Sequence, residues 1–180
     1  MGGPPVVSCG TVVACREVRP NRRTTILARI DPFPDPFKTV LSRREVEALC
    51  RDNGFRLPEV YIDFLVETNG GRPTPDHTRF TASDGKAECW EVASLSSLES
   101  AVEERGDLIE NCEMAADYLP IASLGDDLLL MRVGGEHFGT IEYWMRTHGH
   151  FPSARVVTAF ADFPTFLNSF GTRPVYEDDE

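Results

Sequence analysis

The segment LPEVYIDFLVETNGG, Leu57 to Gly71, has the pattern of one amphipathic helix with a sharp end. Pro58 suits the first helical position, and Glu59 suits the positive end of the helix dipole. The helix should end at Asn69-Gly70-Gly71, because glycine adopts a positive φ without strain. The apolar side chains recur every three or four residues, which predicts one stripe facing a core. This stripe consists of Tyr61, Phe64, Leu65 and Thr68.

A second helix, with strong start and stop signals, precedes this segment. Ser42 and Glu45 have the spacing of a capping box, in which each side chain accepts a hydrogen bond from the other residue's backbone N–H. Leu41 and Val46 stand at the positions of a hydrophobic staple around that cap. Gly54 supplies a left-handed stop. The two helices should therefore follow each other closely.

Beyond Gly71 the pattern changes to short strands and further helices. Two strands are expected at 79–82 and 88–93, then helices at 96–105, with Ser96 and Glu99 as a capping box, and at 107–117. Three successive strands (119–123, 127–133 and 138–145) follow, then a strand at 156–160 and a closing helix at 161–170. This order predicts an α+β fold in which helices pack on a mainly antiparallel sheet.

The first forty residues differ from the rest of the chain. TVVACREV and RRTTILARI are two β-prone runs that flank Arg-Pro-Asn, which predicts a β-hairpin. Residues 31–37, DPFPDPF, contain three prolines and suit an extended connector. We therefore expect an N-terminal extension (1–40), one domain (41–170) and a frayed acidic tail (171–180).

Charge and hydropathy limit the classes of partner. Net charge is −11, with +4 in residues 1–46 and −15 in the remainder. Such an acidic domain should repel nucleic acid and membrane surfaces and attract basic partners. No run reaches the length of a membrane span, and the N-terminus lacks the pattern of a secretory signal. These features favour a cytoplasmic protein.

No catalytic or cofactor motif outweighs a structural explanation. Phosphate-binding, nucleophile-elbow and zinc-protease signatures are absent from the sequence. His148 and His150 could chelate a metal, but a turn before Pro152 explains them more simply. A distant Cys–His pair and a Cys9–Cys15 disulfide remain open alternatives. We expect a protein that is not an enzyme and that has no cofactor and no metal.

Four motifs in order resemble the SUKH superfamily, whose members carry a Smi/Knr-type domain. The family pattern is a LPxxYxxFLxxxNGG helix, a xPIAxxGxGDxxxL strand pair, GxVYYW and a terminal FxxFL, and the resemblance covers about residues 41–170. The matching residues are Leu57, Pro58, Tyr61, Phe64, Leu65, Asn69, Gly70 and Gly71; Pro120, Ile121, Ala122, Gly125 and Asp126; Gly139, Ile141, Tyr143 and Trp144; and Phe163, Phe166 and Leu167.

The resemblance implies binding rather than catalysis. Bacterial members look like immunity proteins that neutralise polymorphic or contact-delivered toxins, many of them nucleases. This implies stoichiometric binding of a basic toxin domain. The alternative is a regulatory or scaffold protein of the Smi/Knr cell-wall (glucan) synthesis type. As contacts for a basic partner we predict four acidic residues near turns and strand ends: Asp126, Asp127, Glu136 and Glu142.

Overall fold

The computed structural model describes residues 29–33, 40–81, 85, 87–146 and 155–171. Its helices are α1 (Arg43–Asp52), α2 (Glu59–Glu67), α3 (Leu98–Cys112) and α4 (Phe163–Asn168). Its strands are β1 (Arg29–Asp31), β2 (Arg72–Thr74), β3 (His77–Thr81), β4 (Ala87–Glu91), β5 (Ser94–Leu95), β6 (Tyr118–Leu124), β7 (Asp127–Arg132), β8 (Ile141–Met145), β9 (Arg155–Phe160) and β10 (Phe170–Gly171). The α+β class is confirmed.

The strands pair antiparallel throughout the described sheets. The largest sheet has the order β5-β6-β7-β8-β9, a second has the order β10-β3-β4, and β1 pairs with β2. An isolated bridge between Gly71 and Leu95 connects the chain just before β2 to β5. The three successive strands predicted from the sequence are therefore β6, β7 and β8, joined as two hairpins.

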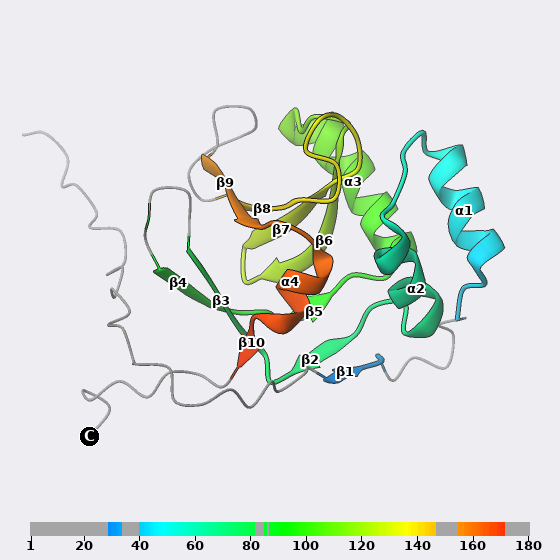
Figure 1. The fold of residues 1–180 in the computed structure, drawn as a ribbon. Helices are drawn as coiled ribbons and strands as arrows, with labels where there is room; N and C mark the ends of the chain where they lie inside the picture. Colours follow the sequence, from blue (N-terminus) through cyan, green and yellow to red (C-terminus); the bar gives the residue numbers. More distant parts are fainter. Residues whose placement is uncertain (1–28, 34–39, 82–84, 86, 147–154, 172–180) are drawn as a thin grey trace, which may run out of the picture.

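Helices cover both faces of the five-stranded sheet, with α4 in front and α3 behind it in Figure 1. Side chains of successive β7 residues point to opposite faces of the sheet, so they pack alternately into the layer in front of it and the layer behind it. Leu129 and Met131 belong to the main core with the aromatic residues of α2 and α4. Leu128 and Leu130 pack instead with Leu108 of α3. The sheet is buried on both faces, which explains the run of apolar residues in β7.

The first two helices form as their sequences predict. Both hydrogen bonds of the capping box between Ser42 and Glu45 are present at the start of α1. On α2, Tyr61 and Phe64 are buried, and their rings lie 4.7 and 5.0 Å from the ring of Phe163 on α4. Trp144, on the opposite face of the sheet, is also buried. The burial predicted for Tyr61 and Phe64 in the stripe of α2 is confirmed.

The Asn69-Gly70-Gly71 segment joins α2 to the start of α3. Asn69 has φ +45°, and its Oδ1 accepts a hydrogen bond from the backbone N–H of Leu98 at 2.9 Å. Its Nδ2 donates to Glu99 at 3.0 Å. A side chain at Gly70 would lie 2.7 Å from the backbone nitrogen of Ser97. This motif therefore caps a helix that begins 29 residues later in the chain.

Two predictions about the region of α3 were wrong. The N-cap is Ser97, whose Oγ accepts a hydrogen bond from Ser100 N, and not Ser96. Ser96 instead donates its N–H to Ile121 O of β6 at 2.9 Å, so it lies just after β5 and before the helix cap. The two predicted helices are one, because α3 continues through Gly106 to Cys112.

The predicted N-terminal hairpin lies mostly outside the described residues. The end of its second run forms β1, and β1 pairs with β2. The proline-rich connector and the acidic tail also lie largely outside the described ranges.

Candidate partner-binding surface

Two of the four predicted contact residues are exposed but lie far apart. Asp126 is in the β6–β7 turn, and Glu136 is in the β7–β8 turn. These turns are at opposite ends of β7, whose six residues span about 20 Å. The structure therefore does not bring Asp126 and Glu136 into one site.

The other two predicted residues are buried, which corrects the expectation that they face a partner. Asp127 accepts hydrogen bonds from Tyr143 Oη at 2.5 Å and from the backbone N–H of Arg146 at 2.9 Å. Glu142 accepts from Tyr118 Oη at 2.7 Å. Each acid is only 7% exposed. Both carboxylates accept hydrogen bonds inside the fold, because a buried charge is stable only when hydrogen-bonded or paired.

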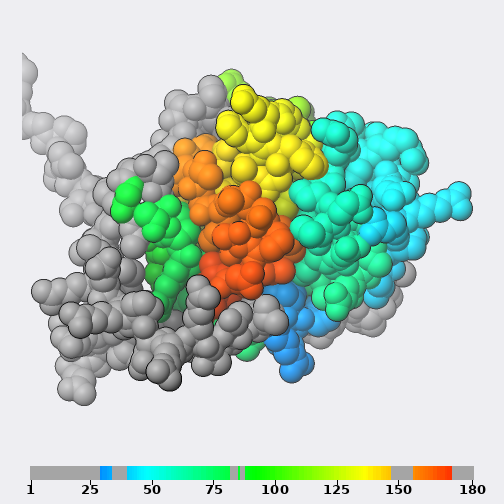
Figure 2. All heavy atoms as spheres, viewed as in Figure 1, coloured from blue at the N-terminus to red at the C-terminus, as the bar shows by residue number. Residues whose placement is uncertain are grey.

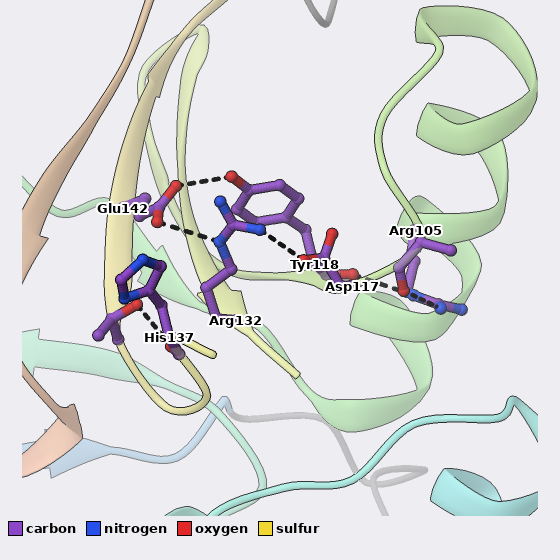
Figure 3. Close-up of polar contacts among 8 residues, drawn as sticks. Arg105, Asp117, Tyr118, Arg132, His137 and Glu142 are labelled. Atoms are coloured by element: carbon purple, nitrogen blue, oxygen red, sulfur yellow. Dashed lines mark hydrogen bonds and ion pairs between the residues drawn. The ribbon is translucent and has the colours of Figure 1, made fainter. Parts of the chain in front are cut away.

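Glu142 belongs to a polar network drawn in Figure 3. Arg132 donates from Nε to Glu142 at 3.0 Å and from Nη1 to Asp117 at 2.5 Å, and its Cζ lies 4.0 Å from the centroid of the Tyr118 ring. Burial alone would lower the pKa of Arg132, but the hydrogen bonds to Glu142 and Asp117 outweigh it and raise that pKa. Burial, with the hydrogen bond to Glu142, raises the pKa of Tyr118. The network joins β6, β7, β8 and the segment after α3.

We expect Glu142→Ala to lower the free energy of unfolding by about 2–3 kcal/mol, because it removes the carboxylate that accepts hydrogen bonds from Tyr118 Oη and Arg132 Nε. The expected loss is below that for an isolated buried pair, since Asp117 still binds Arg132. Urea denaturation measures it. Glu136→Ala, in the exposed β7–β8 turn, is the control and should change stability by less than about 0.5 kcal/mol. Equal stability of the two variants would contradict a structural role for the network.

The described residues offer little for catalysis. Burial raises the pKa of the Cys50 thiol to about 11, so this cysteine is protonated and a poor nucleophile at neutral pH. His77 Nδ1 lies 2.7 Å from Asp76 Oδ1, but this pair contains no nucleophile. Within the described ranges, no cluster of three or more His, Cys, Asp or Glu side chains could hold a metal. His148 and His150 lie outside those ranges.

Helix α3 carries five Asp or Glu residues and one Arg. Residues 96–127 contain nine Asp or Glu and one Arg. Four acids recur along the exposed side of the helix at helical spacing, and we call them the acidic face: Glu99, Glu103, Asp107 and Glu110. Next to them Glu104 is half-buried, and burial raises its pKa, with opposing effects from Arg146 and Asp107. Among the described residues, no Lys or Arg forms an ion pair with the acidic face.

The one arginine of α3 does not neutralise this face, because it points inward. Arg105 donates from Nε to Tyr118 O at 3.0 Å and from Nη2 to Ala116 O at 2.5 Å (Figure 3). Its Cζ also lies 5.1 Å from the centroid of the Phe55 ring. Burial lowers the pKa of Arg105. The positive charge is thus used inside the fold, while the negative charges remain on the surface.

Sequence reasoning missed the acidic face, although a signal was present. The spacing from Glu99 to Glu110 places these acids on one side of a continuous helix. Dividing the segment into two helices at Gly106 hid that alignment. A net charge of −8 over residues 96–127 is the signal that could have pointed to α3.

None of the helices in the described ranges has the length and apolar character needed to cross a membrane.

Neither a search of curated proteins nor a search of solved structures gave a match to the chain. The model of the SMI1 / KNR4 family (SUKH-1) matches residues 41–169, which run from just before α1 through α4. The chain therefore belongs to the SMI1 / KNR4 family (SUKH-1).

Proposed function

We propose that the protein is a non-catalytic, cytoplasmic binding module that acts as an immunity protein. It neutralises a bacterial polymorphic or contact-delivered toxin, such as a nuclease, by stoichiometric binding. The observation that carries this proposal is the acidic face of α3, which presents four carboxylates with no cationic partner among the described residues. Family membership supports a binding role.

The acidic face is costly for the fold. Like charges four residues apart destabilise a helix by about 0.2–0.5 kcal/mol per pair, as for Glu99 with Glu103 and Glu103 with Asp107. Gly106 adds about 1 kcal/mol relative to alanine. A side chain at Gly106 would meet nothing within 4 Å, so packing does not require this glycine. Apart from the hydrogen bond that Glu99 accepts from Asn69, the acids of this face add repulsion to the helix with no ion pair among the described residues, which supports a role in contact with another molecule.

The proposed mechanism is obstruction. A nuclease binds its polyanionic substrate through a basic groove, and the acidic face is complementary to such a groove in charge. Charges at an interface speed the encounter of two proteins, while close contacts set the lifetime of the complex. A bound immunity protein excludes the substrate without reacting, so each molecule inactivates one toxin molecule.

The test is binding to the proteins encoded by the genes beside this one, and the proposal requires that one of them is a toxin that binds. Glu103→Lys combined with Asp107→Lys should slow association about tenfold at low salt, with a smaller effect on dissociation. The difference should shrink as salt rises, because the Debye length falls from about 10 Å at 0.1 M to about 3 Å at 1 M. Stopped-flow or surface-based kinetics would measure both rates.

A matched control makes the same change in net charge elsewhere. Glu67→Lys combined with Glu91→Lys reverses two exposed acids outside α3, on α2 and β4. Equal slowing by both double variants would show that total charge matters and would remove α3 from the interface.

Inhibition of the toxin should saturate at a fixed molar ratio. Inactivation of excess toxin by trace protein would instead reveal an enzyme, and binding to cell-wall synthesis proteins alone would favour the regulatory alternative.

A further inference from the structure

β2 has the composition of a strand that lies at the edge of a sheet. Pro73 stands in its centre, and proline is confined to edge strands because it has no N–H to give to a neighbour. Arg72 and Thr74 on either side of it are exposed. On one side, the Gly71–Leu95 bridge ties this segment to β5. Without β1, the other side of β2 would be an unpaired edge.

The backbone N–H and C=O groups of β2 that β5 does not use point toward β1. Gly71 donates its N–H to Leu95 O at 3.1 Å and accepts from Leu95 N at 2.8 Å, so both of its groups face β5. Because these directions alternate along a strand, the backbone groups of Arg72 and Thr74 face the opposite way. There β1 pairs antiparallel, with Asp31 opposite Arg72 and Arg29 opposite Thr74.

β1 fits this edge through side chains as well as backbone. Ile30 packs against the main hydrophobic core, and Asp31 accepts a hydrogen bond from Thr74 Oγ1 at 3.2 Å. A side chain at Gly71 would lie 2.5 Å from Asp31 O and 2.9 Å from Ile30 Cγ2. Only glycine at position 71 lets β1 approach this closely. Figure 2 shows β1 in blue at the surface of the molecule.

β1 also lies outside residues 41–169, which the family model matches. We propose that the β2 edge is a docking site for an extended peptide segment with a branched apolar residue at its centre, and that β1 occupies this site in cis. Recognition is by strand addition, in which backbone pairing supplies affinity and the contact of Ile30 supplies selectivity. The folded unit therefore includes part of the N-terminal extension, Arg29–Asp31.

The test uses amide hydrogen exchange on the full chain. In an Ile30→Asp variant, the amides of Arg72 and Thr74 should lose protection about tenfold or more, while the amides of β6–β8 keep theirs. A peptide of residues 27–33 (LARIDPF) should then restore protection. It must be supplied at about 5 mM, because a tethered segment has an effective concentration in the millimolar range. The wild-type protein should not respond, since its own β1 fills the site.

A peptide with the same Ile30→Asp change is the control and should restore nothing. Unchanged protection of Arg72 and Thr74 in the variant would overturn the proposal, as would equal effects of the two peptides or a failure of the native peptide to act. If the amides of β6–β8 also lose protection, the variant is unfolded. Ile30→Ala, which keeps a neutral side chain, then replaces it with the same expected outcomes.

Discussion

Gly70→Ala should destabilise the protein by about 3–5 kcal/mol, through overpacking together with an unfavourable backbone conformation. Gly70 has φ +89°, a conformation that residues with a side chain rarely adopt. The added carbon would lie 2.7 Å from Ser97 N and 2.8 Å from Leu95 O. Both are backbone atoms, at the start of α3 and in β5, so neither can move without shifting an element. Thermal or urea denaturation measures the loss.

Gly125→Ala separates the two causes. Gly125 also has a positive φ, +64°, but a side chain there would meet nothing within 4 Å. Its replacement should cost only about 1–2 kcal/mol, the cost of a left-handed conformation. Similar losses at both positions would mean that the close approach of Gly70 to the backbone of Leu95 and Ser97 contributes nothing.

Phe64→Ala should destabilise the protein by about 3–5 kcal/mol, the usual range for truncation of a buried phenylalanine. The Phe64 ring stacks on Tyr61 at 5.7 Å and lies 5.0 Å from Phe163, so the cavity would open between α2 and α4. These helices are far apart in the sequence, and this aromatic contact helps to hold them together. Calorimetry or chemical denaturation measures the effect.

Val60→Ala is the control on the same helix. Val60 is 47% exposed, so truncation should change stability by less than about 0.5 kcal/mol. A small effect at Phe64, comparable to that at Val60, would contradict the packing of α2 against α4.

The candidate site shows where charge patterns fail as a guide to exposure. Asp126 and Asp127 are adjacent acids beside a turn, yet the first is exposed and the second accepts hydrogen bonds from Tyr143 and Arg146. Nothing local distinguishes them, because their partners come from β8 and the residue that follows it. Glu142 is buried for the same reason, through Tyr118 and Arg132.

The sequence by itself determined the features that depend on nearby residues. The capping box of Ser42 and Glu45, the stripe of α2 and the turns of the β6–β7–β8 hairpins all arise from side chains within a few positions of one another. Their stabilising contacts form wherever the backbone adopts the local conformation. The acidity that suggests a basic partner is likewise a property of composition, independent of the fold.

Only the tertiary structure decided the features that join distant segments. Asn69 caps a helix 29 residues away, which helps to place the start of α3 at Ser97 and Leu98 rather than at Ser96. Asp31 meets Thr74 across 43 residues, so the pairing of β1 had no local signal. Arg105 turns inward to carbonyl groups beyond the end of its own helix, so it does not offset the charge of the acidic face. These contacts depend on which surfaces the packed core brings together, and local propensity carries no information about that choice.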